Sequence, residues 1–329
     1  MLLSKLCCST NVRTVAFRKL PQYAFRRTFA EDARQTVRRA RTRTLREKIM
    51  APAGDGAFSI GKGAAAGGAL LGIGALGYYG LGLSDEAGSL EKSVVWPQYV
   101  KERIKDTYMY FGGSLVVTAT SAMAAFRSPA IMNIVTKNGF LGLAISLGAI
   151  MGTGMIARSI PYKEGFGAKQ IAWLAHTATM GAMVAPLCFL GGPILIRAAW
   201  YTAGIVGGLS TIAVCAPSEK FLTMGGPLAM GLGVVFVSSV GSMFLPPTTA
   251  LGAGLYSISL YGGLLLFSAF MLYDTQRIIA QAERYPTTPG FYGVTPYDPV
   301  NAAMSVYLDT LNIFIRLATI LAGGGNKRK

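Results

Sequence analysis

The sequence has little charge, a single histidine and only four cysteines in 329 residues. Charged residues make up 14% of the chain, whereas soluble domains carry about 25%. One histidine excludes metal sites built from two or three histidines, and the cysteines show no disulfide framework. The chain also lacks the Gly-x-Ser-x-Gly, His-Glu-x-x-His, Walker and Cys-x-x-Cys motifs. We therefore expect neither enzymatic activity nor a resident cofactor.

Apolar residues are abundant instead, at 52% of the chain with 41 glycines. Runs of about 20 apolar residues, each long enough to cross a bilayer, recur along the sequence. This pattern predicts an all-α, polytopic membrane helix bundle whose main partner is the lipid bilayer. The expected spans are 58–83, 108–126, 139–157, 170–190, 193–214, 224–245, 249–273 and 300–322.

The net charge of +16 is concentrated at the N-terminus, because residues 1–50 hold 13 Lys or Arg and three acids, a balance of +10. An Arg-rich, acid-poor segment with Ser and Thr is typical of a mitochondrial presequence. Arg27 stands shortly before Phe29 and Ala30, which predicts processing after Phe29. The alternative is a solvated basic tail in another membrane. We do not expect nucleic-acid binding, since the arm lacks interleaved aromatic residues and leads into membrane spans.

The charge pattern also predicts the topology. Eight spans put both basic ends on one side and the acid-bearing connection 84–107 on the other, so the positive-inside rule places both termini in the matrix. We divide the chain into a presequence and basic arm (1–50), an extra span with an intermembrane-space loop (51–107) and a seven-helix core (108–329). A short interfacial helix is expected over 92–107, behind Trp96 and Pro97.

Small residues recur in the first span, as Gly63-x3-Gly67 and Gly68-x3-Gly72. Small residues four apart lie on one helix face and allow close helix packing in lipid. The spacing predicts helix association, either within the chain or between copies of it.

Two aspartates stand out because they lie in or beside apolar spans. A charge near the centre of a membrane helix costs roughly 2.5–3.5 kcal/mol, so its default interpretation is functional. Asp309 shares a helix face with Ser305, Asn312 and Arg316, at spacings of 4, 3 and 4. The alternative is an inert structural pair of Asp309 with Arg316.

Asp274 shares a face with Arg277 and Gln281. This segment is expected to begin to emerge from the bilayer, so its alternative is a solvated helix end. If Asp274 and Asp309 approach each other, they cannot easily both be ionised and would titrate as a unit. Ca²⁺ would offset their repulsion, but two carboxylates hold it only transiently without further oxygen ligands. K⁺/H⁺ exchange would use the same groups.

Three other polar residues lie at bilayer depth. His176 is either a proton relay or a hydrogen-bonding partner of a neighbouring helix, and the second is the more common role. Arg158 and Arg197 are expected to snorkel to the interface. A salt bridge from one of them to an aspartate would latch a pore closed, and the sequence does not select between them.

Several segments together resemble the transmembrane Bax inhibitor motif family. They include Met180 to Leu187, Leu272-Tyr273-Asp274-Thr275-Gln276 and the run from Tyr307 to Phe314, within a resemblance over about 108–322. The family implies a seven-helix core with a di-aspartate pH sensor, at Asp274 and Asp309 by motif position. The basic arm and the extra span are similar to those of one mitochondrial member.

The resemblance implies an inner-membrane protein that passes Ca²⁺ against protons and acts in cristae organisation and resistance to apoptosis. A second hypothesis is a membrane scaffold that does not transport ions. Such a scaffold would organise cristae and would regulate inner-membrane proteases or cytochrome c release by contact. The two hypotheses can coexist.

Overall fold

The computed structural model describes residues 47, 50–54, 56–84, 86, 88–136, 140–285 and 296–325. The chain divides into two compact units, residues 1–51 and 52–329. The predicted presequence and its processing site at Phe29 and Ala30 lie outside the described residues. The fold given below is that of the second unit.

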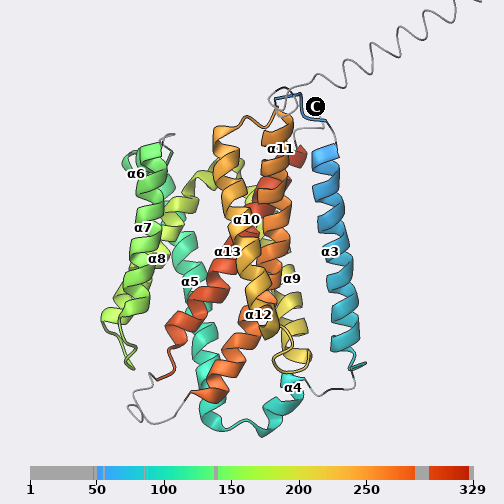
Figure 1. Ribbon diagram of the computed structural model, residues 1–329. Coiled ribbons are helices and arrows are strands. Elements are labelled where there is room, and N and C mark those ends of the chain that lie inside the picture. The colour runs from blue at the N-terminus through green and yellow to red at the C-terminus, as the bar shows by residue number, and fades with distance from the viewer. Residues whose placement is uncertain are drawn as a thin grey trace, which may run out of the picture. The chain divides into compact units, whose positions relative to one another are not determined.

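The described residues form helices and no strand (Figure 1). Eight helices are long: α3 (Gly56–Gly80), α5 (Gln98–Phe126), α7 (Phe140–Ser159), α8 (Ala168–Val184), α9 (Gly192–Cys215), α10 (Gly225–Phe244), α12 (Gly263–Arg284) and α13 (Pro299–Gly325). The short ones are α4 (Ser89–Lys92), α6 (Pro129–Thr136) and α11 (Ala250–Ser257), with 3-10 turns η1 (Ser93–Val95), η2 (Ala185–Leu190) and η3 (Leu222–Met224). A π-helical segment, η4 (Ile258–Gly262), joins α11 to α12.

Among the described residues, seven helical segments are long and apolar enough to span a membrane: 58–80, 98–126, 168–190, 192–215, 222–244, 250–284 and 299–323. The predicted polytopic all-α membrane bundle is confirmed. The eighth predicted span, 139–157, corresponds to α7, which is not among the seven and runs antiparallel to α8 beside it (Figure 1). The start of α3 and the end of α13 lie at one end of the bundle, and α4 lies at the other (Figure 1).

Helix α13 is the centre of the bundle and packs against α5, α9 and α12. It carries Tyr307, Met304 and Ile313, which are among the largest fully buried side chains. Several polar side chains inside the bundle bond to each other, which offsets the cost of burying them. Tyr307 and Thr118 of α5 share a hydrogen bond of 2.6 Å, and Trp173 of α8 donates to Ser114 at 2.8 Å.

Two predicted span boundaries fall inside helices. Residues 98–107 do not form a separate interfacial helix but are the first turns of α5, so the division at 107/108 falls inside a helix. The predicted span end at 273 also falls inside a helix, since α12 carries Asp274 and continues to Arg284. In both places no glycine or proline interrupts the helix, over 98–111 and 264–285, and tertiary contacts let it extend past the apolar run.

Within the chain, helix α3 packs through only one of the four glycines singled out in the sequence, Gly68, together with Gly61. Gly61 lies against Ser257 and Tyr261, and Gly68 lies against Leu265. Among the described residues, no atom lies within 4 Å of where a Cβ would stand at Gly63, Gly67 or Gly72. The contact face of α3 within the chain therefore follows a spacing of seven residues, two helical turns, rather than four.

Candidate ion site at Asp274 and Asp309

The structure brings together the two aspartates that the sequence singled out. Asp274 lies on α12 and Asp309 on α13, two helices that pack against each other. Their carboxyl groups interact electrostatically, and the two residues are 7% and 5% exposed. Two buried carboxyl groups that interact in this way cannot easily both be ionised, so the pair favours a state with one proton bound.

One carboxyl oxygen of Asp309 lacks a hydrogen bond in the described part of the chain. Its Oδ2 is buried, and no hydrogen-bond partner for it exists among the described residues. Leaving a buried polar atom unsatisfied costs about 1–3 kcal/mol, and more when the group is charged. An acceptor in this position is therefore available to a proton or to a cation.

Asp274 is the more accessible of the two. Its Oδ1 lies 3.8 Å from Nη1 of Arg277, one helical turn away, and the Arg277 side chain is 48% exposed. Asp274, Arg277 and Gln281 all line one cavity, so the predicted polar face exists. It lies within a longer helix, however, and the solvated helix end considered for Asp274 is not observed.

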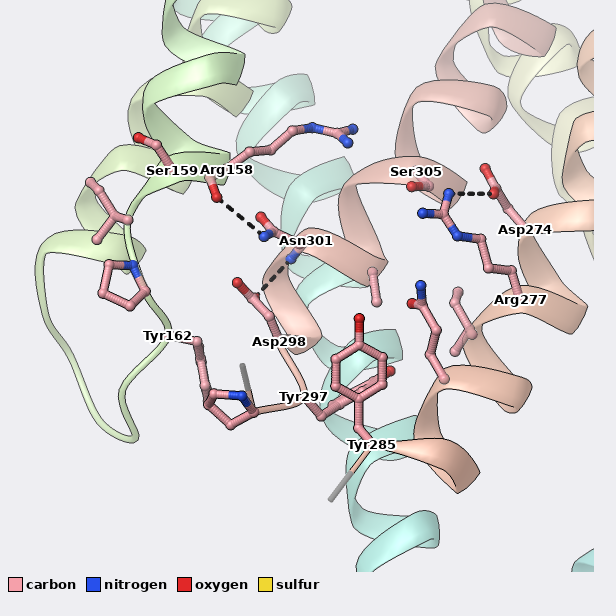
Figure 2. Close-up of a pocket in the computed structure, with 16 residues that line it drawn as sticks. Arg158, Ser159, Tyr162, Asp274, Arg277, Tyr285, Tyr297, Asp298, Asn301 and Ser305 are labelled. Carbon is pink, nitrogen blue, oxygen red and sulfur yellow. Dashed lines mark hydrogen bonds and ion pairs between the residues drawn. The ribbon is translucent and has the colours of Figure 1, made fainter. Parts of the chain in front are cut away.

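The cavity has a volume of about 440 Å³ and lies between the end of α7, the second half of α12 and the start of α13 (Figure 2). Ser305 of α13 and Asp274 lie together at one side of it. Asp309 follows Ser305 by one turn of α13. The cavity therefore connects the aspartates to the end of the bundle where α12 ends and α13 begins.

Lys169 holds together three residues that line this cavity, a role that the sequence did not reveal. Its ammonium group bonds to Asp298 at 2.7 Å, to Oδ1 of Asn301 at 2.8 Å and to the carbonyl of Ile160 at 3.0 Å. Asp298 also accepts from the backbone N–H of Asn301 at 3.0 Å, at the start of α13. The sequence Asp298-Pro299 could have indicated that Asp298 stands at a helix start, since an acid followed by proline favours that position.

Arg316 does not pair with Asp309, so the structural pair considered as the alternative for Asp309 is not observed. The two residues are seven apart on α13, about 10.5 Å along the axis. Arg316 instead donates to the carbonyl and Oδ1 of Asn312, at 3.1 and 2.8 Å, and to the carbonyl of Ser259 at 3.2 Å. The predicted polar face of α13 therefore has two parts, the aspartate pair and a separate group around Arg316.

His176 lies outside the cavity lining and contacts a neighbouring helix. Its Nδ1 lies 3.0 Å from Oγ1 of Thr153 on α7, and its ring packs against Gly154. Nε2 of His176 is buried and has no partner in the described part of the chain. These contacts favour the interhelical hydrogen bond over the proton relay.

A buried carboxylate pair beside a cavity, within a bundle of membrane-spanning helices, defines a multi-pass membrane protein with a polar site in its core. The family model described as "Inhibitor of apoptosis-promoting Bax1" matches residues 100–327. The chain therefore belongs to the Bax inhibitor family, as the sequence motifs predicted. The match begins within the first turn of α5, so α3 precedes it.

Individual relatives agree with this assignment. The chain is 54% identical to a growth hormone-inducible transmembrane protein of Rattus norvegicus over 307 residues, 92% of this chain and 88% of the relative. It is 28% identical to Bax inhibitor 1 of the same organism, over 70% of this chain and 89% of the relative. An uncharacterized Helicobacter pylori protein is also 28% identical, over 70% and 90%.

Proposed function

We propose that this protein is a cation/proton exchanger or pH-gated leak of the mitochondrial inner membrane, with Asp274 and Asp309 as its ion site. The observation that carries the proposal is the unpartnered, buried Oδ2 of Asp309 beside the Asp274 carboxyl group. A pair that shares a proton has one position that either a proton or a cation can fill. Exchange between the two is the minimal chemistry of such a site.

Ca²⁺ is the favoured cation and K⁺ the alternative. Carboxylate oxygens suit Ca²⁺, which takes six to eight oxygen ligands, so water or backbone carbonyls must add to the pair. Among the described residues, no group of three or more His, Cys, Asp or Glu could hold a metal ion. Weak coordination suits an ion in transit rather than a stored one.

The basic arm and the positive-inside rule support the matrix as the side of both termini. The cavity lies where α12 ends and α13 begins. That end of the bundle is opposite the end of α13 (Figure 1), so in this orientation the cavity faces the intermembrane space. Each positive charge gains about 2.3 kcal/mol per 100 mV on entering a negative matrix. An uncoupled path would therefore carry Ca²⁺ into the matrix. Export of Ca²⁺ from the matrix requires coupling to protons at the aspartate pair.

Arg158 is the arginine we assign as the latch. It lines the cavity that Asp274 also lines, whereas Arg197 is not among the lining residues (Figure 2). A guanidinium group beside a carboxylate favours the ionised carboxylate and competes with an entering cation. Protonation of the pair would weaken that attraction and release the arginine.

Proteoliposome flux tests the proposal. Wild type, Asp274→Asn and Asp309→Asn are compared with Ca²⁺ and K⁺ at two pH values, with Glu164→Gln as a matched control on the exposed α7–α8 connection. We expect Asp309→Asn to abolish flux in a folded protein and Glu164→Gln to leave it unchanged. Flux that is unchanged in both aspartate variants would overturn the exchanger.

The scaffold hypothesis makes the opposite prediction in cells, where the protein is proposed to support cristae organisation and resistance to apoptosis. In cells that lack the protein, a scaffold carrying Asp309→Asn would still restore cristae morphology, whereas changes in the 84–107 connection would not. Loss of rescue by Asp309→Asn ties the morphology to ion exchange.

A further inference from the structure

Arg316 is a membrane-embedded cation that has no carboxylate partner. None of the three ion pairs in the described part of the chain includes it. Its contacts are the carbonyl of Ser259, the side chain and carbonyl of Asn312, and the ring of Phe267, which lies 4.6 Å from the guanidinium carbon. Charged residues within membrane spans are costly and mark ion pathways, so an arginine held only by neutral groups requires an explanation.

The surrounding backbone is built to hold this guanidinium group in place. The π-helical segment η4 interrupts the regular helix, and its Ser259 carbonyl accepts from Nε of Arg316. Such π segments often occur at functional sites. A Cβ atom at Gly263 would collide with Nε and would lie 2.8 Å from both Cζ and Nη2. The absence of a side chain at Gly263 therefore leaves the space that Arg316 occupies.

The order of groups along α13 places Arg316 on the far side of the aspartate pair from the cavity. Asn301 and Ser305 line the cavity, Asp309 follows, and then Asn312 and Arg316. The spacings of 4, 4, 3 and 4 keep all five on one helix face. A cation that leaves the aspartates away from the cavity along this polar face next meets the guanidinium group.

We propose that Arg316 is the charge barrier of the cation path on the side away from the cavity. The inference rests on the proposed function. It adds a residue that selects between monovalent and divalent cations. Repulsion between the guanidinium group and a cation at the aspartates scales with the cation charge, over a separation of about 10 Å. At an effective dielectric constant of about 20, this repulsion lowers the occupancy of the aspartate site by K⁺ roughly tenfold. It lowers the occupancy by Ca²⁺ by roughly the square of that factor.

Ion flux through proteoliposomes, measured separately for Ca²⁺ and K⁺, tests this role. The variants are Arg316→Gln, which removes the charge, and Arg316→Lys, which keeps it. Gly263→Ala displaces the guanidinium group without changing any charge, and Gly262→Ala is its matched control, since the nearest atom to a Cβ there lies 3.6 Å away. Folding is checked for every variant by gel filtration and circular dichroism.

We expect Arg316→Gln to raise K⁺ flux by about tenfold or less and Ca²⁺ flux by a clearly larger factor. Gly263→Ala should change the Ca²⁺/K⁺ ratio in the same direction, while Arg316→Lys and Gly262→Ala leave it near the wild-type value. The additional flux should disappear in Arg316→Gln combined with Asp309→Asn. A purely structural arginine would lower both fluxes together and leave their ratio unchanged.

Two failures are distinguishable. If wild type shows flux that depends on Asp309 but Arg316→Gln leaves the Ca²⁺/K⁺ ratio unchanged, the barrier is refuted and the exchanger stands. If wild-type flux is absent or does not depend on either aspartate, the exchanger is refuted and the barrier falls with it.

Discussion

Lys169 and Asp298 form an ion pair of 2.7 Å in which the lysine side chain is only 1% exposed. The pair joins the start of α8 to the residue before α13, across 129 positions of sequence. All three of the lysine hydrogens have acceptors, since Asn301 and the Ile160 carbonyl take the other two. The pair therefore fixes the wall of the cavity that leads to Asp274.

Removal of the lysine should destabilise the protein strongly. Lys169→Met leaves Asp298 without its cation, and breaking a buried pair costs roughly 3–5 kcal/mol. We expect a large fall in the thermal unfolding midpoint in detergent. Lys163→Met, on the connection that precedes α8 and exposed, should change it little. If Asp298→Leu restores the stability of Lys169→Met, the unpaired charge is responsible and not the lost packing. An unchanged midpoint in Lys169→Met would contradict the prediction.

Arg277 should weaken cation binding at the cavity. Its Nη1 lies 3.8 Å from Asp274, but its side chain is 48% exposed, so its effect is screened by water. At about pH 8, we expect Arg277→Gln to lower the half-saturating Ca²⁺ concentration by about twofold to fivefold. Arg284→Gln is the control, because Arg284 lies on the same helix and pairs with Glu219 outside the cavity. An equal effect of both variants would mean that only the general surface charge matters.

Tyr297 should make stability fall at high pH. Burial raises its pKa to about 12, against the smaller lowering effects of the Thr107 hydrogen bond and Arg103. Between its ordinary value near 10 and 12, the unfolded chain loses the proton while the folded protein keeps it, so stability decreases as pH rises. The loss is on the order of 2–3 kcal/mol across this window. Tyr297→Phe should show a shallower decline in chemical denaturation, and equal slopes would contradict the assignment.

Gly181 lies at a close contact between α8 and α5. A Cβ there would collide with Ser121 and would lie 2.5 Å from the Thr118 carbonyl oxygen and 3.1 Å from the Ala122 nitrogen. Because backbone atoms cannot move aside, Gly181→Ala should cost about 1–3 kcal/mol in thermal unfolding. Gly112→Ala on α5 is the matched control, since nothing lies within 4 Å of its Cβ position, and alanine favours helix. Equal stability of the two variants would mean that the helices separate freely.

The sequence alone predicted much of the fold because bilayer thickness limits the length of apolar runs. Each predicted span has a corresponding helix, and the two aspartates stood out because charge is costly in lipid. The ends of helices were less predictable where polar residues continue a helix beyond its apolar run. That is why α5 starts earlier and the helix carrying Asp274 ends later than expected.

Partners distant in sequence were beyond prediction. Lys169 had no local signal for Asp298, and helical spacing alone placed Arg316 on the same face as Asp309 without showing what each one touches. A face is about 100° wide and several turns long, so residues on it need not meet.

The sequence by itself determined a membrane helix bundle of the Bax inhibitor family and the identity of its two buried acids, because hydropathy and motifs are local properties. Only the tertiary structure decided that the two acids interact, that a cavity leads to Asp274, and that Arg316 is held by the π segment instead of by Asp309. Those contacts depend on how α12 and α13 pack, and the packing is set by side chains far apart in the chain.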